Sequence, residues 1–345
     1  MLRVLARLLP ILVCFSPAAK TQSWSVQTTG IETNLRGVSA AYSNVPGETS
    51  RPVVWACGSH GVILRSADLG KTWQRIHVTG GDALDFRGIA AIGAEVAYVM
   101  SIGDSGRSRI YKTANAGTTW KLQYSDPRPA FFLDAISCTS AMRCFALGDP
   151  IDGKFVLLTT SDGEHWAELP HTPPALPKEG SFAASSSVLA VHDRNIYFAT
   201  GGPAARVFRS PDSGRKWTVT ATPVVSGNES SGIFSLGVQG RTLIAVGGDY
   251  KLTGRNYRAA AYSFDGGKTW HLSTQMPGGF RSAVAVIDGV TVAAGPKGED
   301  VSMDKGVHWQ RAGSLDLNAL TILDSQNGWG VGAHGTIARL ITRRK

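Results

Sequence analysis

The sequence has little charge, few cysteines and no long apolar run after its N-terminal region. Only 18% of its 345 residues are charged, and four are cysteines. No pattern has the length and period of a helix, and no basic–aromatic ladder typical of nucleic-acid binding accompanies the net charge of +9. A zinc-ligand spacing, a nucleophile elbow and a dinucleotide glycine fingerprint are also missing. The sequence therefore predicts a protein that is not embedded in a membrane, does not bind nucleic acid, and uses no cofactor or metal.

Two segments, SADLGKTW and SFDGGKTW, contain Gly-Lys-Thr, the end of a phosphate-binding loop. The complete loop needs another glycine five residues before the glycine of that triplet. Arg65 occupies this position in the first segment and Tyr262 in the second. The P-loop interpretation therefore fails twice. What recurs is a larger unit: serine, any residue, aspartate, any residue, glycine, two residues, tryptophan.

The N-terminus has the pattern of a secretory signal peptide. Arg3 and Arg7 precede an apolar run at 8–15, and small residues follow at 16–19. We expect cleavage near residue 19, which leaves 20–345 as an exported chain in the periplasm or the extracellular medium. Lipidation at Cys14 is the weaker alternative, because Val13 stands where a smaller residue is preferred.

The eight-residue unit appears in four complete copies and two relaxed ones. The complete copies span 66–73, 210–217, 263–270 and 302–309. One relaxed copy has Asn115 in place of aspartate, and the other begins at Thr159, with Ser161 in that place and Asp162 displaced by one. The copies end at Trp73, Trp120, Trp166, Trp217, Trp270 and Trp309, at spacings of 47, 46, 51, 53 and 39 residues. A period of this length is typical of a propeller or solenoid.

Each period contains four short strand-like segments, which is the content of one propeller blade. The six units account for six blades, and the segment after Trp309 supplies three more strands. The missing outer strand can come from the mature N-terminus, with Trp24 in the place of the repeated tryptophan. We therefore predict an all-β, seven-bladed propeller that is closed by pairing of its N- and C-terminal strands.

The repeated unit predicts a stapled turn between the third and fourth strands of each blade. Serine and aspartate oxygens accept hydrogen bonds from backbone N–H groups, glycine adopts a conformation that other residues resist, and tryptophan packs between sheets. We therefore assign structural roles to Ser66, Asp68, Gly70, Trp73, Trp120, Trp166, Asp212, Trp217, Asp265, Trp270, Asp304 and Trp309.

These units resemble the Asp-box (BNR-type) propellers, a group that includes sialidases, sortilin-like receptors and xyloglucanases. Within this group, the segment LTILDSQNGWGVGAHGTIARL looks most like the photosystem II stability/assembly factor-like proteins. The resemblance covers nearly the whole mature chain. It implies the propeller fold, and more weakly a role in binding or assembling a protein partner, because one propeller frame serves many functions.

Candidate binding residues lie on the face opposite the Asp boxes. We predict that Arg36, Arg87 and Arg281 hold one register at the start of three innermost strands, and that Asn318 fills it in the last blade. Together they can bind a carboxylate, a sulfate or an acidic peptide; the alternative is that each arginine pairs with neighbouring protein groups. Longer loops on the same face add Arg107, Arg109, Tyr250, Arg255, Tyr257 and Arg258.

The resemblance leaves two functions open. The first is a non-catalytic scaffold for a protein with an acidic or carboxylate-bearing segment, and the second is a sialidase-like hydrolase that acts on extracellular glycans. The sequence lacks the Arg-Ile-Pro triplet usual in sialidases, and nothing in it pairs the acidic residues of this face, so we assign no catalytic residue. Those acidic residues are Asp134, Asp149, Asp152, Asp249 and Glu299.

Cys138 and Cys144 lie on the two arms of a predicted hairpin, which favours a cross-strand disulfide over two reduced thiols. Cys57 is expected to be a lone core thiol. His60 and His334 occupy equal places in Gly-Ser-His-Gly and Gly-Ala-His-Gly, but no third ligand is evident. We therefore predict turn histidines rather than a metal site.

Overall fold

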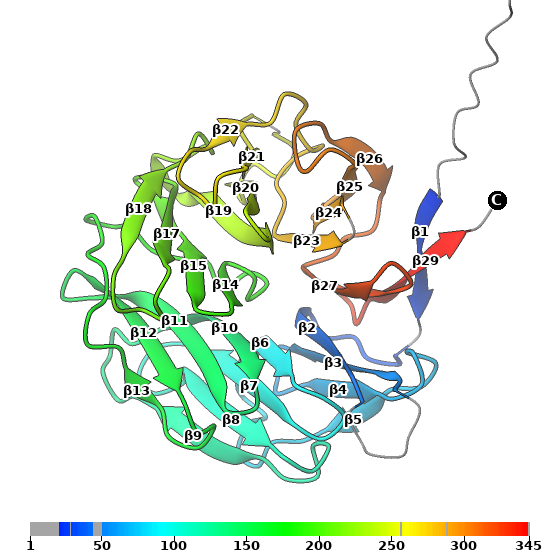
Figure 1. Ribbon diagram of the computed structural model, residues 1–345. Helices are drawn as coiled ribbons and strands as arrows, with labels where there is room; N and C mark the ends of the chain where they lie inside the picture. Colours follow the sequence, from blue (N-terminus) through cyan, green and yellow to red (C-terminus); the bar gives the residue numbers. More distant parts are fainter. Residues whose placement is uncertain (1–20, 28, 44–49, 256, 288, 344–345) are drawn as a thin grey trace, which may run out of the picture.

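The computed structural model describes residues 21–27, 29–43, 50–255, 257–287 and 289–343. The predicted signal peptide, 1–19, lies outside the described residues. The described chain forms seven antiparallel sheets in a ring (Figure 1). It contains no helix, and so none that is long and apolar enough to cross a membrane. The seven-bladed propeller expected from the repeat is confirmed.

Blades 1 to 4 follow one another along the chain, and each contains four strands ordered from the axis outward. Their strands are β2 (Leu35–Tyr42), β3 (Pro52–Gly58), β4 (Ile63–Ser66) and β5 (Gln74–Ile76); β6 (Asp85–Ala91), β7 (Ala97–Ile102), β8 (Arg109–Thr113) and β9 (Lys121–Ser125); β10 (Leu133–Ser140), β11 (Arg143–Ile151), β12 (Lys154–Thr160) and β13 (Ala167–Glu168); β14 (Leu189–His192), β15 (Asn195–Ala199), β17 (Arg206–Ser210) and β18 (Thr218–Ala221).

Blades 5 to 7 complete the ring, and blade 5 gains a short fifth strand, β16 (Gly201–Gly202), which pairs with β19. Their other strands are β19 (Asn228–Gln239), β20 (Thr242–Asp249), β21 (Ala260–Ser263) and β22 (His271–Leu272); β23 (Ala283–Ile287), β24 (Val290–Gly295), β25 (Gly298–Ser302) and β26 (Gln310–Gly313); β27 (Ala319–Asp324), β28 (Asn327–Val331), β29 (Ile337–Arg343) and β1 (Thr21–Gln27).

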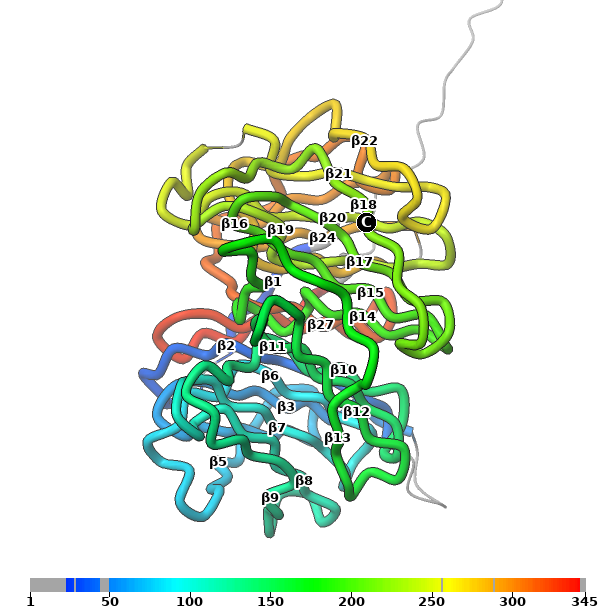
Figure 2. Tube along the Cα trace, turned by 90° about the vertical axis from the view of Figure 1, so that its left-hand side faces the viewer, coloured from blue at the N-terminus to red at the C-terminus, as the bar shows by residue number. Residues whose placement is uncertain are grey.

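The core lies between neighbouring blades, which stand around the axis of a thick disc (Figure 2). The second strand of a blade is covered on both faces, and β3 is accordingly buried along its whole length. The fourth strand is at the outer rim, and two of the three residues of β5 are exposed. This difference explains why second strands are continuous apolar runs while the outer strands are short and polar.

Blade 7 is completed by the two ends of the chain. β1 pairs with β29 from Thr21 opposite Arg343 to Gln27 opposite Ile337, and Trp24 lies opposite Leu340. The half-buried Trp24 packs against the core cluster of Ala294, Leu317 and Ala338. The predicted closure is confirmed, and the ring has no free edge at this blade.

Each of the six Asp boxes forms a turn between the third and fourth strands. In the first box, the Ser66 hydroxyl donates to Asp68 (2.8 Å) and accepts from the Gly70 N–H (2.8 Å). Asp68 in turn accepts from the N–H of Thr72 (2.9 Å). The same pattern recurs at Asp212, Asp265 and Asp304. The tryptophan packs against the blades beside it; Trp309 is only 1% exposed.

The box before Trp166 begins one residue later than the sequence indicated. The Thr160 hydroxyl, not that of Thr159, accepts from the Gly163 N–H (2.9 Å) and contacts Asp162 (3.2 Å). Asp162 therefore takes the aspartate role, and the assignment of Ser161 to it was wrong. The turn is one residue shorter than the others.

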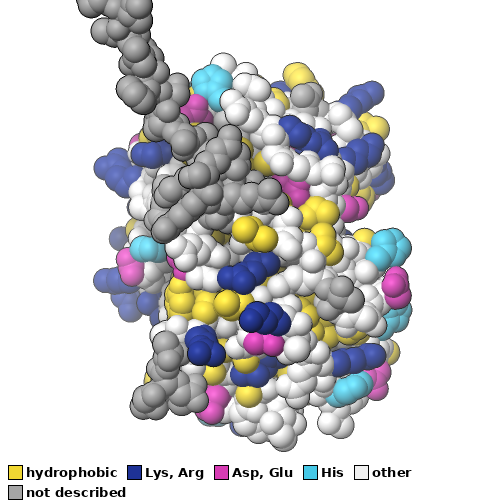
Figure 3. Space-filling view, turned by 90° about the vertical axis from the view of Figure 1, so that its right-hand side faces the viewer, with side chains coloured by type: hydrophobic (Ala, Val, Ile, Leu, Met, Phe, Trp, Pro, Cys, Tyr) yellow, Lys and Arg dark blue, Asp and Glu magenta, His cyan; other side chains and the backbone are white. Residues whose placement is uncertain are grey.

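Cys138 and Cys144 form a disulfide between β10 and β11, as predicted, and Cys57 is a buried free thiol. The side of the ring that carries the terminal strands shows Lys and Arg side chains dispersed among apolar and polar groups (Figure 3). The net positive charge is therefore not gathered into a single field on this side.

Candidate functional site

Two sets of loops meet on one face of the ring, which we call the upper face. They are the loops that precede the innermost strands and the loops between second and third strands. In blades 1 and 2, the N–H of Gly61 from the second set donates to the carbonyl of Leu84 from the first (2.8 Å). The Asp boxes lie at the opposite end of the blades. A ligand on the upper face is therefore remote from the boxes.

Four innermost strands share a bulge in their upper-face half, and the bulge adds one extra residue on the side of the ring axis. In blade 1, Leu35 and Gly37 pair with consecutive residues of β3, so Arg36 is the extra residue. The same register shift occurs at Arg87, Asp134 and Phe234. The bulge residue is therefore basic in blades 1 and 2, acidic in blade 3 and aromatic in blade 5.

Arg36 and Arg87 form what we call the arginine pair. The Arg36 guanidinium contacts the Asn318 amide oxygen of blade 7 (3.4 Å), and its Nε–H is buried without a hydrogen-bond partner. Burial first, and then the charge of Arg87, lower the pKa of Arg36 to about 10. Arg87 pairs with Asp85 (2.8 Å). Among the described residues, Arg36 has no salt bridge of its own.

Arg281 does not belong to this group, and its predicted register was wrong by one residue. A Cβ on Gly295 would meet the Arg281 Cα at 3.0 Å, as one on Gly58 would meet the Leu35 Cα at 3.0 Å. Arg281 therefore takes the buried position of Leu35 rather than the channel position of Arg36. It is 0% exposed and donates to Asp300 (2.7 Å).

The acidic residue at the channel mouth, Asp134, is also buried. Its Oδ2 atom has no hydrogen-bond partner, and burial together with the charge of Asp149 raises its pKa well above the usual value. Burial raises the pKa of Asp149 to about 6. Asp249 and Glu299 lie on other blades. The structure therefore brings together only two of the five candidate acids of a hydrolase, and one of them is out of reach of a substrate.

The channel mouth is closed by a segment that we call the plug, residues 181–187 in the loop before β14. Its hydrogen bonds reach blades on both sides of the axis. The Ala183 carbonyl accepts from Arg87 of blade 2 (3.0 Å), while the Ser185 hydroxyl donates to the Ser282 carbonyl of blade 6 (2.7 Å). Figure 1 shows this loop beside β14 extending into the centre of the ring. A ligand on the upper face therefore contacts the plug rather than an open channel.

Four rings form what we call the aromatic cluster on the blade 4–6 side of the plug: Phe182, Phe234, Tyr250 and Phe280. Phe182 stacks on Phe234 with centroids 3.8 Å apart, and Tyr250 lies edge-on to both. Phe234 and Phe280 are 3% and 4% exposed, whereas Tyr250 is 46% exposed. Tyr250 is thus an exposed aromatic side chain on a buried aromatic base.

The remaining predicted binding residues lie further from the channel. Arg107 is exposed on the loop between β7 and β8, and Arg109 donates to the Gly106 carbonyl of that loop (2.7 Å). Arg255 and Tyr257 are exposed on the loop after β20, where the Arg258 guanidinium donates to the Pro223 carbonyl. The structure therefore brings Arg36 and Arg87 together and places Tyr250 against the plug, whereas these five side chains make no described contact with the arginine pair or the plug.

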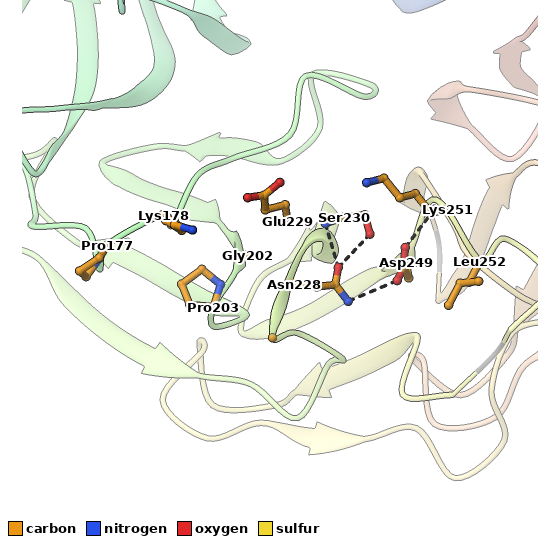
Figure 4. A pocket seen from close by; sticks show the side chains of 11 residues that line it. Pro177, Lys178, Gly202, Pro203, Asn228, Glu229, Ser230, Asp249, Lys251 and Leu252 are labelled. Atoms are coloured by element: carbon orange, nitrogen blue, oxygen red, sulfur yellow. Dashed lines mark hydrogen bonds between the residues drawn. The ribbon is translucent and has the colours of Figure 1, made fainter.

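A pocket of about 660 Å³ opens beside Tyr250, between blades 4 and 5. Lys178 and Lys251 lie on opposite sides of it, with Glu229 between them (Figure 4). Asp249 accepts from Asn228 (3.4 Å) and from the Lys251 N–H (2.9 Å), so its carboxylate is engaged within the protein. The pocket carries charges of both signs and does not select for one ligand charge.

Comparison with known proteins agrees with this architecture. The BNR/Asp-box repeat model matches residues 261–272, which include the box from Ser263 to Trp270. The described chain is a β-propeller that carries Asp-box repeats. No curated protein sequence matches it.

Solved structures similar to this Asp-box propeller include two of YCF48. One, described as YCF48 bound to D1 peptide, aligns over 93% of this chain and 97% of its own with 13% identity and a TM-score of 0.62. YCF48 from Cyanidioschyzon merolae aligns over 92% and 98% with 15% identity and a TM-score of 0.65. The WD40 propeller domain of Doa1 aligns over 93% and 98% with 10% identity and a TM-score of 0.60. Similarity at these identities shows the fold.

Sequence reasoning missed the plug and the aromatic cluster of this propeller. The plug lies in a 20-residue connection between β13 and β14, and the length of that loop was a signal that could have identified it. Phe234 was missed because it looks like a core residue of a strand. Only the pairing register shows that it is the bulge residue in its blade.

Proposed function

We propose that this Asp-box propeller is an exported, non-catalytic scaffold that binds a carboxylate-bearing or acidic segment of a protein partner on its upper face. The observation that carries this proposal is the arginine pair. Arg36 is half-buried, makes one weak hydrogen bond to Asn318 and no described salt bridge, and lies beside the guanidinium of Arg87. A bound carboxylate would pair with both guanidinium groups and relieve the repulsion between two like charges.

The structural comparison supports the partner class. YCF48, a photosystem II assembly factor, has a solved structure with a bound D1 peptide, so a propeller of this shape can hold a peptide. We propose peptide binding for this chain on that basis. A glycan is the alternative ligand, and no described feature of the site favours it over a carboxylate.

The test is partner capture by the exported protein. Cross-linking in the cells of origin, followed by mass spectrometry, identifies the partner, and the purified pair then gives the affinity. We expect the Arg36→Ala/Arg87→Ala variant to lose at least about tenfold in affinity, because hydrogen bonds to charged groups contribute about 1.5–3 kcal/mol each. The melting temperature should fall only a little, since the loss of the partly exposed Arg87–Asp85 pair and of the bond to Ala183 is offset by relief of the repulsion between the two arginines.

The matched control is Lys71→Ala/Arg75→Ala, which also removes two positive charges but from exposed positions in and after the first Asp box. This variant should bind as the unmodified protein does. Equal capture by both variants would reject the arginine pair as the binding site.

A further inference from the structure

The arginine pair and the aromatic cluster lie next to each other across the plug, although they belong to opposite sides of the ring. The Ala183 carbonyl accepts from Arg87 (3.0 Å), and the preceding residue, Phe182, has its ring centroid 6.5 Å from that of Tyr250. One peptide unit of the plug therefore connects the two groups. These two contacts, of 3.0 and 6.5 Å, and the one residue step of the plug between them make a path of about 13 Å, which an extended ligand of about four residues spans at about 3.3 Å per residue.

Tyr250 has the properties of an anchor for an apolar side chain. It is 46% exposed, yet it is held edge-on against Phe182 and Phe234, with centroid distances of 6.5 and 6.1 Å. Its backbone N–H donates to the Ser230 carbonyl (3.1 Å). A ring fixed in this way loses little conformational entropy when a ligand covers it, and exposed rigid tyrosines are typical centres of binding energy.

The plug itself is rigid enough to serve as the floor between the two groups. Ser186 has a φ of 63°, and its hydroxyl accepts from the Ile136 N–H (2.9 Å) and donates to the Ile136 carbonyl (3.1 Å). Ser187 bonds the Ser235 hydroxyl of blade 5 (2.6 Å). A non-glycine residue keeps such a φ only where its surroundings hold it. The plug is therefore fixed at several points, and the upper face is continuous from Arg87 to Tyr250.

We infer that the ligand is an extended peptide with two determinants: a carboxylate held by Arg36 and Arg87, and an apolar side chain, about three to five residues away, that covers Tyr250. This inference rests on the proposed function, because the arginine pair must bind the carboxylate. The inference adds an apolar side chain and its distance from the carboxylate to the proposed function. The partner is therefore defined by a short sequence pattern and not by its charge alone.

The experiment uses fluorescein-labelled decapeptides of Gly, Ser and Thr with a free C-terminal carboxylate and one leucine, placed at each position from second to eighth from that end. Fluorescence anisotropy with the mature protein measures the affinity of each. We expect one maximum of affinity, three to five residues from the carboxylate, about tenfold above the leucine-free peptide. A flat profile would overturn the inference.

Two variants separate the determinants. Tyr250→Ala should remove the tenfold preference for leucine and keep the binding of the carboxylate, whereas Arg36→Ala should weaken every peptide in the set. The matched control is Lys178→Ala, in the neighbouring pocket, which should leave the profile unchanged. If Lys178→Ala rather than Tyr250→Ala removes the preference, the pocket is the anchor and the inference is wrong.

C-terminally amidated peptides make the two possible failures distinguishable. If Tyr250→Ala binds as the unmodified protein does while amidation still abolishes binding, the second determinant fails and the proposed function stands. If the amides bind as well as the acids, the arginine pair is not the site, and the proposed function fails together with the inference. Binding of a neutral oligosaccharide that depends on Tyr250, without any preference among the peptides, would also overturn the inference.

Discussion

Arg281 and Arg36 differ in surroundings rather than in chemistry. Arg281 is fully buried, donates to the Asp300 carboxylate (2.7 Å) and to the Phe280 carbonyl (2.8 Å), and holds the end of blade 6 together. Arg36 has a single weak contact, to Asn318 (3.4 Å). The buried arginine therefore contributes to stability, and the half-buried one is available to a ligand.

Replacement of Arg281 should be costly to folding. The Arg281→Met variant leaves the Asp300 carboxylate buried without its partner, and breaking a buried pair in this way costs about 3–5 kcal/mol of unfolding free energy. Urea unfolding measures the change, with Arg36→Met as the matched control, expected within about 1 kcal/mol of the unmodified protein. Equal losses in the two variants would contradict the assignment of different roles.

Asp149 should make stability depend on pH. Burial raises the pKa of its carboxyl to about 6, above the value of about 3.9 for an unfolded chain, so the folded protein holds this proton more tightly. Its contribution to the unfolding free energy is therefore full below about pH 4 and falls by about 1–3 kcal/mol as the pH rises to about 6. It then stays low at higher pH.

The Asp149→Asn variant should remove this fall. Urea unfolding between pH 4 and 8 gives the difference between the variant and the unmodified protein, which should grow with pH up to about 6 and then level off. Asp152→Asn, in the exposed turn of the same hairpin, is the control. A difference that does not change with pH would show that Asp149 is not the group responsible.

The Asp box holds one turn together, and its serine hydroxyl makes two of the hydrogen bonds that stabilise the turn. In the box of blade 6, the Ser302 hydroxyl is 1% exposed, accepts from the Gly306 N–H (2.8 Å) and donates to Asp304 (2.9 Å). Asp304 then holds the His308 N–H (2.9 Å). Removal of the serine oxygen therefore leaves the Gly306 N–H without its partner and Asp304 without the hydroxyl that orients it.

Ser302→Ala should lower the unfolding free energy by about 1–3 kcal/mol, because it leaves the Gly306 N–H buried without a partner. Peptide binding should not change, since the turn lies at the end of the blade opposite the arginine pair. Met303→Ala, which alters a 73% exposed side chain in the same turn, is the control and should cost little. A loss of peptide affinity in Ser302→Ala would contradict the separation of the boxes from the binding face.

The boxes also show where the sequence is a good guide. Serine, aspartate, glycine and tryptophan at fixed spacing form one turn through their own hydrogen bonds, so the sequence alone predicts the turn. The copy before Trp166 was misaligned because Thr159 and Thr160 are equally able to accept the glycine N–H. The folded blade decides between them, because strand pairing buries Thr160 in the same way as the first residue of the other boxes.

The ring as a whole depends on the strand that joins its ends. β1 contributes a full set of backbone partners to β29, from Gln27 opposite Ile337 to Thr21 opposite Arg343. Without it, β29 would be an exposed edge, and exposed edges pair with other chains. The ring should therefore be less stable and prone to self-association when β1 is absent.

Deletion of residues 21–27 tests this dependence. We expect the melting temperature to fall by at least about 5 °C and dimers or larger species to form, measured by thermal unfolding and by size-exclusion chromatography with light scattering. A synthetic peptide of residues 20–31 should restore the monomer, and its Trp24→Ala form should do so less well. A deleted protein that is monomeric and equally stable would contradict closure by β1.

The number of blades and the closure were predictable because they follow from a repeat, of which the sequence contains six copies. The binding face was only partly predictable. The sequence predicted Arg36, Arg87 and Tyr250, which the proposal keeps, but it also included Arg281, because a one-residue bulge shift is invisible without pairing. It missed the plug, because a loop that reaches across the axis makes its contacts with residues 50 to 100 positions away.

A crystal structure of the mature protein with the tightest-binding leucine peptide of the anisotropy set would test the central claim most directly. The account predicts that the peptide lies over the plug, with its carboxylate within hydrogen-bond distance of Arg36 and Arg87 and its leucine against Tyr250. A peptide held at the Asp-box face, or on the upper face with no carboxylate at the arginine pair, would contradict it.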